Sequence, residues 1–190
     1  MTTQNTLPAP SLSTMWLQQR GDHVRPWWQQ VQALGFTQIE LSHIVTPAMI
    51  AGLRPGEIPV SSVHFPAPTQ PHPHDARLAE VLIGSSDESL RRWAVAQAKG
   101  SLDLAAAWGA RAVCIHAGRV EMPERLEWVL YQRFYGGYAG TPVYQAALDA
   151  FLAARAAAAE PALSQVRRSL HELARHAESV GVRIGVETRL

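Results

Sequence analysis

Four short apolar segments each end in a residue that can bind a metal ion or move a proton. Glutamates close two of them, at Glu40 in QIE and Glu187 in IGVE, and histidines close the others, at His64 in SVH and His116 in VCIH. Imidazole and carboxylate groups bind divalent ions and act as acids and bases. One histidine at such a place is more often a hydrogen-bonded core residue, so the interpretation rests on all four together.

The elements that position these residues follow one recurring arrangement. Apolar residues at helical spacing predict helices, and in three cases a glycine ends the helix and an apolar strand follows within a few residues. Those glycines are Gly35, Gly109 and Gly181. The predicted strands are 37–42, 60–65, 111–116 and 182–187, with a short one within 11–17. The predicted helices are 24–34, one opening at Thr46-Pro47, one running to Trp108 from a capping box of Ser85 and Glu88, and 163–180.

Apolar strands that alternate with helices indicate a parallel sheet covered by helices. Because the crossovers are right-handed in nearly all such sheets, all the strands point the same way. Polar residues at their carboxyl ends then gather on one face, and that face carries the active site in barrels and in open sheets alike. We therefore expect the four strand-end residues to lie near one another.

Two further segments are predicted to lie outside this pattern. Residues 1–10 (MTTQNTLPAP) are polar and contain prolines, which is typical of a flexible tail. Residues 119–160 form a long helical insertion with a Gly/Tyr-rich hinge at 135–140. An insertion after a strand's carboxyl end lies over the site, so this one is interpreted either as a lid or as a surface helix pair without a role in the site.

The order QIELS, SSVHFP, AVCIHAGR and GVRIGVETR resembles the xylose isomerase-like barrel superfamily. This superfamily includes sugar-phosphate isomerases and epimerases, and abasic-site nucleases of the endonuclease IV type. The resemblance covers about residues 12–190 apart from the insertion, and it implies an α/β fold of the parallel (β/α) TIM-barrel type. Its short motifs are more specific for the fold than for the substrate.

The resemblance also implies roles for individual residues. Glu187 matches the metal-binding glutamate of the fifth strand, which also serves as an acid or base in the isomerase branch. His116 and His64 match histidines that bind metal in the nuclease branch and line the substrate pocket in the epimerase branch. Glu40 resembles a second-strand glutamate that supports the site. The candidate substrate-binding residues are Glu40 itself, His43 after the second strand, and Arg189, two residues beyond Glu187.

A complete barrel of this type has eight strands in about 250 residues, and this sequence predicts about five. The chain is therefore interpreted as a partial barrel, either the first part of a longer protein or one whose missing strands come from a partner such as a second copy. We favour the first reading and expect little turnover from these 190 residues alone.

The function implied is that of a metal-dependent sugar or sugar-phosphate isomerase or epimerase, which moves a proton between adjacent carbons. His64, His116 and Glu187 are sufficient to hold a catalytic ion, since such sites often use three protein ligands. Zn, Mn, Mg and Co all suit these ligands. The alternatives are an abasic-site phosphodiesterase of the endonuclease IV type and a barrel fragment without catalysis.

Composition bounds these hypotheses. The formal net charge of +1 and the absence of Lys/Arg runs argue against nucleic acid as a partner, because phosphate contacts need a basic surface. No apolar run approaches the length of about 20 residues that spans a bilayer. The single cysteine, Cys114, cannot form an intrachain disulfide. We therefore expect a cytoplasmic protein that acts on a small molecule.

Overall fold

The computed structural model describes residues 9–18, 20–72 and 82–187. Its centre is a five-stranded sheet in which every neighbouring pair is parallel. The strands lie in chain order: β1 (Ser11–Ser13), β2 (Gln38–Leu41), β3 (Val60–His64), β4 (Ala112–His116) and β5 (Arg183–Glu187). The predicted α/β class with parallel strands is thus confirmed, and the described strands form an open sheet with β1 and β5 at its edges.

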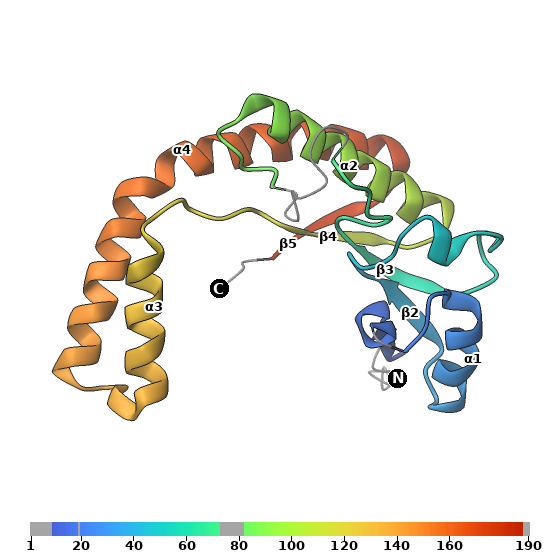
Figure 1. Cartoon of the computed structure of the whole chain (residues 1–190). Helices are drawn as coiled ribbons and strands as arrows, with labels where there is room; N and C mark the ends of the chain where they lie inside the picture. The colour runs from blue at the N-terminus through green and yellow to red at the C-terminus, as the bar shows by residue number, and fades with distance from the viewer. Residues whose placement is uncertain (1–8, 19, 73–81, 188–190) are drawn as a thin grey trace, which may run out of the picture.

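Helices and helical turns connect the strands. They are η1 (Thr14–Leu17), α1 (Val24–Ala33), η2 (Ala48–Ile50), α2 (Glu88–Ala107), α3 (Glu124–Arg133), η3 (Phe134–Tyr138) and α4 (Pro142–Val180). In Figure 1, α2 and α4 run together over one side of the sheet, while α3 and the first part of α4 project from it as a helical hairpin. No helix among the described residues is long and apolar enough to cross a membrane.

The two faces of the sheet differ in chemistry. Val63, Val113 and Ile115 point to the side that the helices cover, and they are fully buried with Leu102 of α2 and Leu173 of α4. Side chains alternate along a strand, so the residues between them point to the opposite face. That face carries Glu40, Ser62, His64, Cys114, His116 and Glu187. The apolar face packs against the helices, and the polar face carries the side chains that could bind a ligand or a metal ion.

Several local predictions were wrong. Asp87, not Ser85, caps α2, since its carboxylate accepts hydrogen bonds from the backbone N–H groups of Ser89 and Leu90. The predicted strand within 11–17 is only three residues long, because Thr14 already begins η1. The segment after Pro47 forms a single short turn, η2, instead of a longer helix.

The insertion and the last predicted helix are continuous. A single helix, α4, runs for 39 residues from the hinge to Gly181, although Pro161 lies inside it. Proline removes one backbone donor and crowds the preceding turn, which bends a helix without always ending it. Figure 1 shows α4 bent along its length. The second half of the insertion and the helix predicted at 163–180 are therefore parts of one helix.

Candidate metal centre

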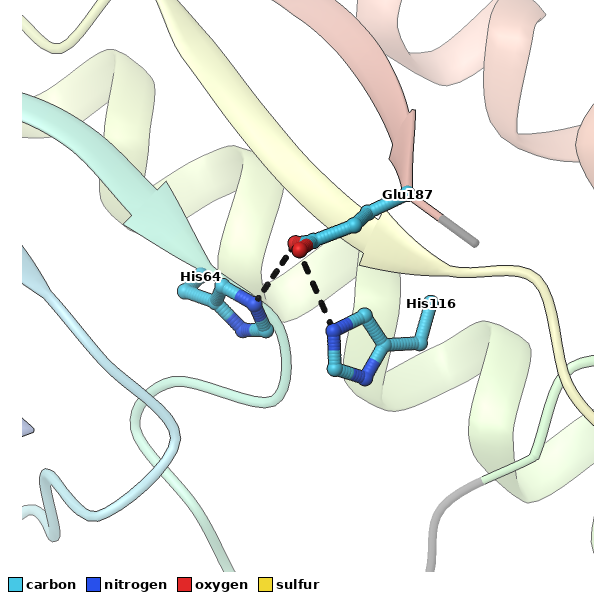
Figure 2. A group of neighbouring side chains, drawn as sticks. All are labelled: His64, His116 and Glu187. Atoms are coloured by element: carbon cyan, nitrogen blue, oxygen red, sulfur yellow. Dashed lines mark ion pairs between the residues drawn. The ribbon is translucent and has the colours of Figure 1, made fainter. Parts of the chain in front are cut away.

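Three side chains from adjacent strands meet at the carboxyl edge of the sheet. His64 ends β3, His116 ends β4 and Glu187 ends β5, and Figure 2 shows their side chains pointing toward one another. The register of the strands explains why they meet. His116 of β4 pairs with Glu187 of β5, and Cys114, two residues before His116, pairs with His64 of β3. One potential ligand atom from each residue lies within 4.8 Å of the others.

The distances suit an ion bound between the three groups. Nε2 of His64 lies 3.5 Å and Nε2 of His116 lies 3.4 Å from the same oxygen, Oε2 of Glu187. A charge-assisted hydrogen bond between such atoms is typically about 2.7–2.9 Å long. Ligand atoms that surround zinc in a tetrahedron, with bonds of about 2.0–2.1 Å, are separated by roughly 3.3 Å. The two N···O distances are therefore close to the ligand separations around such an ion, and all three ligand atoms lie within 4.8 Å of one another.

A backbone contact sets the protonation of one of these histidines. Nδ1 of His64 lies 3.1 Å from the carbonyl oxygen of Phe65. A carbonyl oxygen only accepts, so Nδ1 carries the proton and donates. In the neutral ring, Nε2 then has a free lone pair, and it is Nε2 that faces Glu187. Histidine ligands of metals commonly use this kind of contact to fix the tautomer.

Cys114 lies beside the carboxylate on the same face of the sheet. Its thiol donates to Oε2 of Glu187 at 3.2 Å. This contact is the largest influence that lowers the pKa of Glu187, and the neighbouring His116 and His64 lower it further against the opposing effect of burial. Burial, followed by the contact with the Glu187 carboxylate, raises the pKa of the Cys114 thiol to about 12. The carboxylate is thus held in its ionised form, which is the form that binds metal.

The site is open to small molecules. The exposed fraction of the side chain is 15% for His64, 32% for His116 and 55% for Glu187. A buried structural metal would be enclosed by its ligands, whereas a catalytic ion keeps a position for water or substrate. The graded exposure therefore favours a reactive centre.

Two other predicted site residues, Glu40 and His43, lie near this cluster and are not part of it. Glu40 lies deeper in the sheet, where its Oε2 accepts a hydrogen bond from the Ser62 hydroxyl at 3.1 Å. The ring of His43 lies beside that of His64, with 5.8 Å between centroids. Arg189 falls outside the described residues. Among those residues, His64, His116 and Glu187 form the only group of three or more metal-binding side chains.

A pocket of about 260 Å³ adjoins the cluster at His116. Its walls come from the segment after β4, from α3 and from the middle of α4, and they include Arg119, Phe151 and Arg155. These three residues lie inside the insertion at 119–160 and were not predicted as site residues. The sequence offers a partial signal, since Arg119 lies only three residues after His116 at the end of β4.

Comparisons with protein-family models, with curated proteins and with solved structures found no match to this chain.

Proposed function

We propose that this chain binds a divalent metal ion through His64, His116 and Glu187. The observation that carries the proposal is the convergence of two Nε2 atoms on one carboxylate oxygen, at 3.4 and 3.5 Å, from the ends of three adjacent strands. A carboxylate and two imidazoles are a common ligand set for catalytic zinc, and they also suit Mn or Co.

We further propose that the sheet is of the (β/α) barrel type. In such a barrel each strand pairs with the next one along the chain, whereas the order reverses partway across a doubly wound sheet. The order β1 to β5 contains no such reversal. The polar face then corresponds to the inside of the barrel, and the metal ligands lie at its carboxyl end, where barrel enzymes have their active sites.

The activity proposed is proton transfer between adjacent carbons of a sugar or sugar derivative, as in an isomerase or epimerase. A divalent ion bound here supplies a Lewis acid that polarises a carbonyl. The contacts of Glu187 with His64, His116 and Cys114 all use Oε2, which leaves Oε1 to take a proton from the carbon beside the carbonyl and to return it to the neighbouring carbon. His64 keeps its tautomer through Phe65 and orients the ligand set.

Metal analysis tests the binding proposal. The protein is equilibrated with Zn²⁺, Mn²⁺, Co²⁺ or Mg²⁺ in turn, and bound metal is measured by mass spectrometry after gel filtration. We expect about one ion per chain in the wild type and an affinity lower by about 10- to 100-fold or more in His116→Ala and His64→Ala. His171→Ala is the control, because His171 lies on α4 and contacts Arg175. Equal metal content in all these variants would refute the centre.

A second measurement tests the activity. The metal-loaded protein is incubated in D₂O with ketoses and their phosphates, and exchange of the hydrogen beside the carbonyl is followed by proton NMR. We expect exchange that chelators abolish and that Glu187→Gln reduces strongly. Absence of exchange across the whole panel, together with cleavage of an abasic duplex, would support the phosphodiesterase alternative instead.

A further inference from the structure

The pocket next to His116 has a composition that points to the substrate. It is lined by Leu82, His116, Gly118, Arg119, Val120, Met122, Pro123, Glu127, Phe151 and Arg155. His116 belongs both to this lining and to the metal cluster, so the pocket adjoins the cluster. A molecule that reacts at the metal can therefore extend into the pocket.

The charges in the pocket favour an anion. Among the described residues, its lining includes two guanidinium groups, Arg119 and Arg155, and one carboxylate, Glu127. The two arginines come from different elements, since Arg119 follows β4 and Arg155 lies on α4. Guanidinium groups form paired hydrogen bonds with phosphate and carboxylate oxygens, which gives them a strong preference for these anions.

Arg155 differs from the other arginines of α4. Arg167 pairs with Glu160, Arg168 pairs with Glu88, and Arg175 contacts His171. Arg155 has no ion pair with any other residue that the structure describes. Its side chain nevertheless lines a pocket. Its guanidinium is thus available to a ligand.

The size and the remaining walls restrict the ligand further. Binding sites for drug-sized molecules occupy about 300–1,000 Å³, and this pocket of about 260 Å³ suits a smaller group. Leu82, Met122 and Phe151 add apolar surface to the walls, which suits the carbon atoms of a ligand whose anionic group contacts the guanidinium groups. The pocket thus matches one anionic group and a few carbons.

We propose that this pocket binds the terminal anionic group, phosphate or carboxylate, of a small polyhydroxylated substrate whose reacting carbons lie at the metal cluster. This inference rests on the proposed function and narrows it, because it selects acidic sugar derivatives over neutral sugars. Arg155 and Arg119 are the specificity-determining residues.

Three probes that differ in one group test this: glycerol 3-phosphate, glycerate and glycerol. Their binding is measured by calorimetry and by ligand-observed NMR, both with EDTA and with the metal that the protein retains. In EDTA we expect one or both anions to bind and glycerol not to bind, and the preferred anion identifies the group. Binding should weaken about tenfold or more in Arg155→Ala and Arg119→Ala, in line with the loss of a charged hydrogen bond.

The matched control is Arg167→Ala, which removes another exposed arginine of α4 that pairs with Glu160 outside the pocket. We expect this variant to bind the anions as the wild type does, and Arg155→Lys to restore part of the affinity. Equal affinities in Arg155→Ala and Arg167→Ala, or no preference for anions over glycerol, overturn the inference. Anion binding in EDTA by a protein that takes up no metal would support the pocket and refute the metal centre. Metal uptake by a protein whose anion binding is unchanged in Arg155→Ala would support the metal centre and refute the pocket.

Discussion

The thiol of Cys114 and the carboxylate of Glu187 lie side by side on β4 and β5, with Sγ 3.2 Å from Oε2. The pair forms because Cys114 is two residues before His116 on its strand, and so points to the same face as the histidine. The contact places a neutral donor next to the carboxylate that would bind the metal.

The first prediction concerns the reactivity of Cys114. With its pKa raised to about 12, the thiol is almost entirely protonated at pH 8, whereas a free cysteine with a pKa of about 8.5 is partly ionised. Since the thiolate is the nucleophile, we expect iodoacetamide to alkylate Cys114 at least about 100-fold more slowly than glutathione at this pH. Mass spectrometry of the intact protein follows the reaction. A rate equal to that of glutathione would contradict the geometry.

The second prediction concerns the titration of Glu187 in the metal-free protein. The contact with Cys114 is the largest influence that lowers the pKa of this carboxyl group. Removing the donor in Cys114→Ala should raise that pKa toward its ordinary value, and carbon-13 NMR of the side-chain carboxyl group measures the change. Cys114→Ser keeps a donor and should resemble the wild type. The same titration midpoint in wild type and Cys114→Ala would show that the thiol has no such effect.

The third prediction concerns Glu88, which joins α2 to α4. Its carboxylate accepts hydrogen bonds from Arg91, Arg92 and Arg168, and the contact with Arg91 is the main reason that its pKa is lowered to about 2. A lowered carboxyl pKa contributes stability above the ordinary value of 4.5, and that contribution is lost as the pH falls toward 2. Glu88→Gln should therefore lower the melting temperature at pH 6, and the difference from wild type should shrink at pH 3.

Thermal unfolding of Glu160→Gln provides the control for Glu88. Glu160 also pairs with an arginine, Arg167, but both side chains are largely exposed, and such pairs contribute little. A melting temperature that falls equally in both variants at pH 6 would mean that the link between α2 and α4 is no stronger than an ordinary surface pair.

The fourth prediction compares two glycines. A Cβ on Gly84 would lie 2.7 Å from Cγ2 of Val166 on α4 and 3.3 Å from the carbonyl oxygen of Ala117. Overpacking of this kind costs about 1–3 kcal/mol, so Gly84→Ala should lower the free energy of unfolding. A Cβ on Gly100, within α2, meets nothing within 4 Å. Gly100→Ala should stabilise the protein by about 0.5–1 kcal/mol, because alanine is the better helix former. Denaturant titration measures both, and equal effects would contradict the close approach of α4 to Gly84.

The sequence predicted β2 to β5 well because each has a short apolar run, and in three of the four a glycine that ends the preceding helix comes shortly before it. Four predicted strands match β2 to β5 within two residues at each end, and His64, His116 and Glu187 follow from the rule that parallel strands share one carboxyl edge. Glu40 obeys the same rule but lies deeper, since β2 pairs it with Ser62 and not with His64. Register between strands depends on three-dimensional packing and is not apparent in any one segment.

The features that the sequence did not reveal depend on contacts between distant segments. Cys114 could have been included, because a residue two positions before a strand-end ligand shares its face. Arg155 could not have been included, because it lines the same pocket as His116 only through the packing of α4 against the rest of the fold. The sequence analysis also did not reveal that α4 continues through Pro161.

The length of α4 gives the molecule regions of unequal stability. Its 39 residues extend about 58 Å along the helix at 1.5 Å per residue, and its buried residues begin only at Ala159. Residues 142–158 and all of α3, every one of them described, contain none. Amide hydrogens in this projecting half should exchange through local opening, while those near Leu173 should exchange only when the core unfolds. We therefore expect α4 to contain both strongly and weakly protected amides. A ligand that contacts Phe151 and Arg155 would slow exchange only in the weakly protected part of α4, residues 142–158.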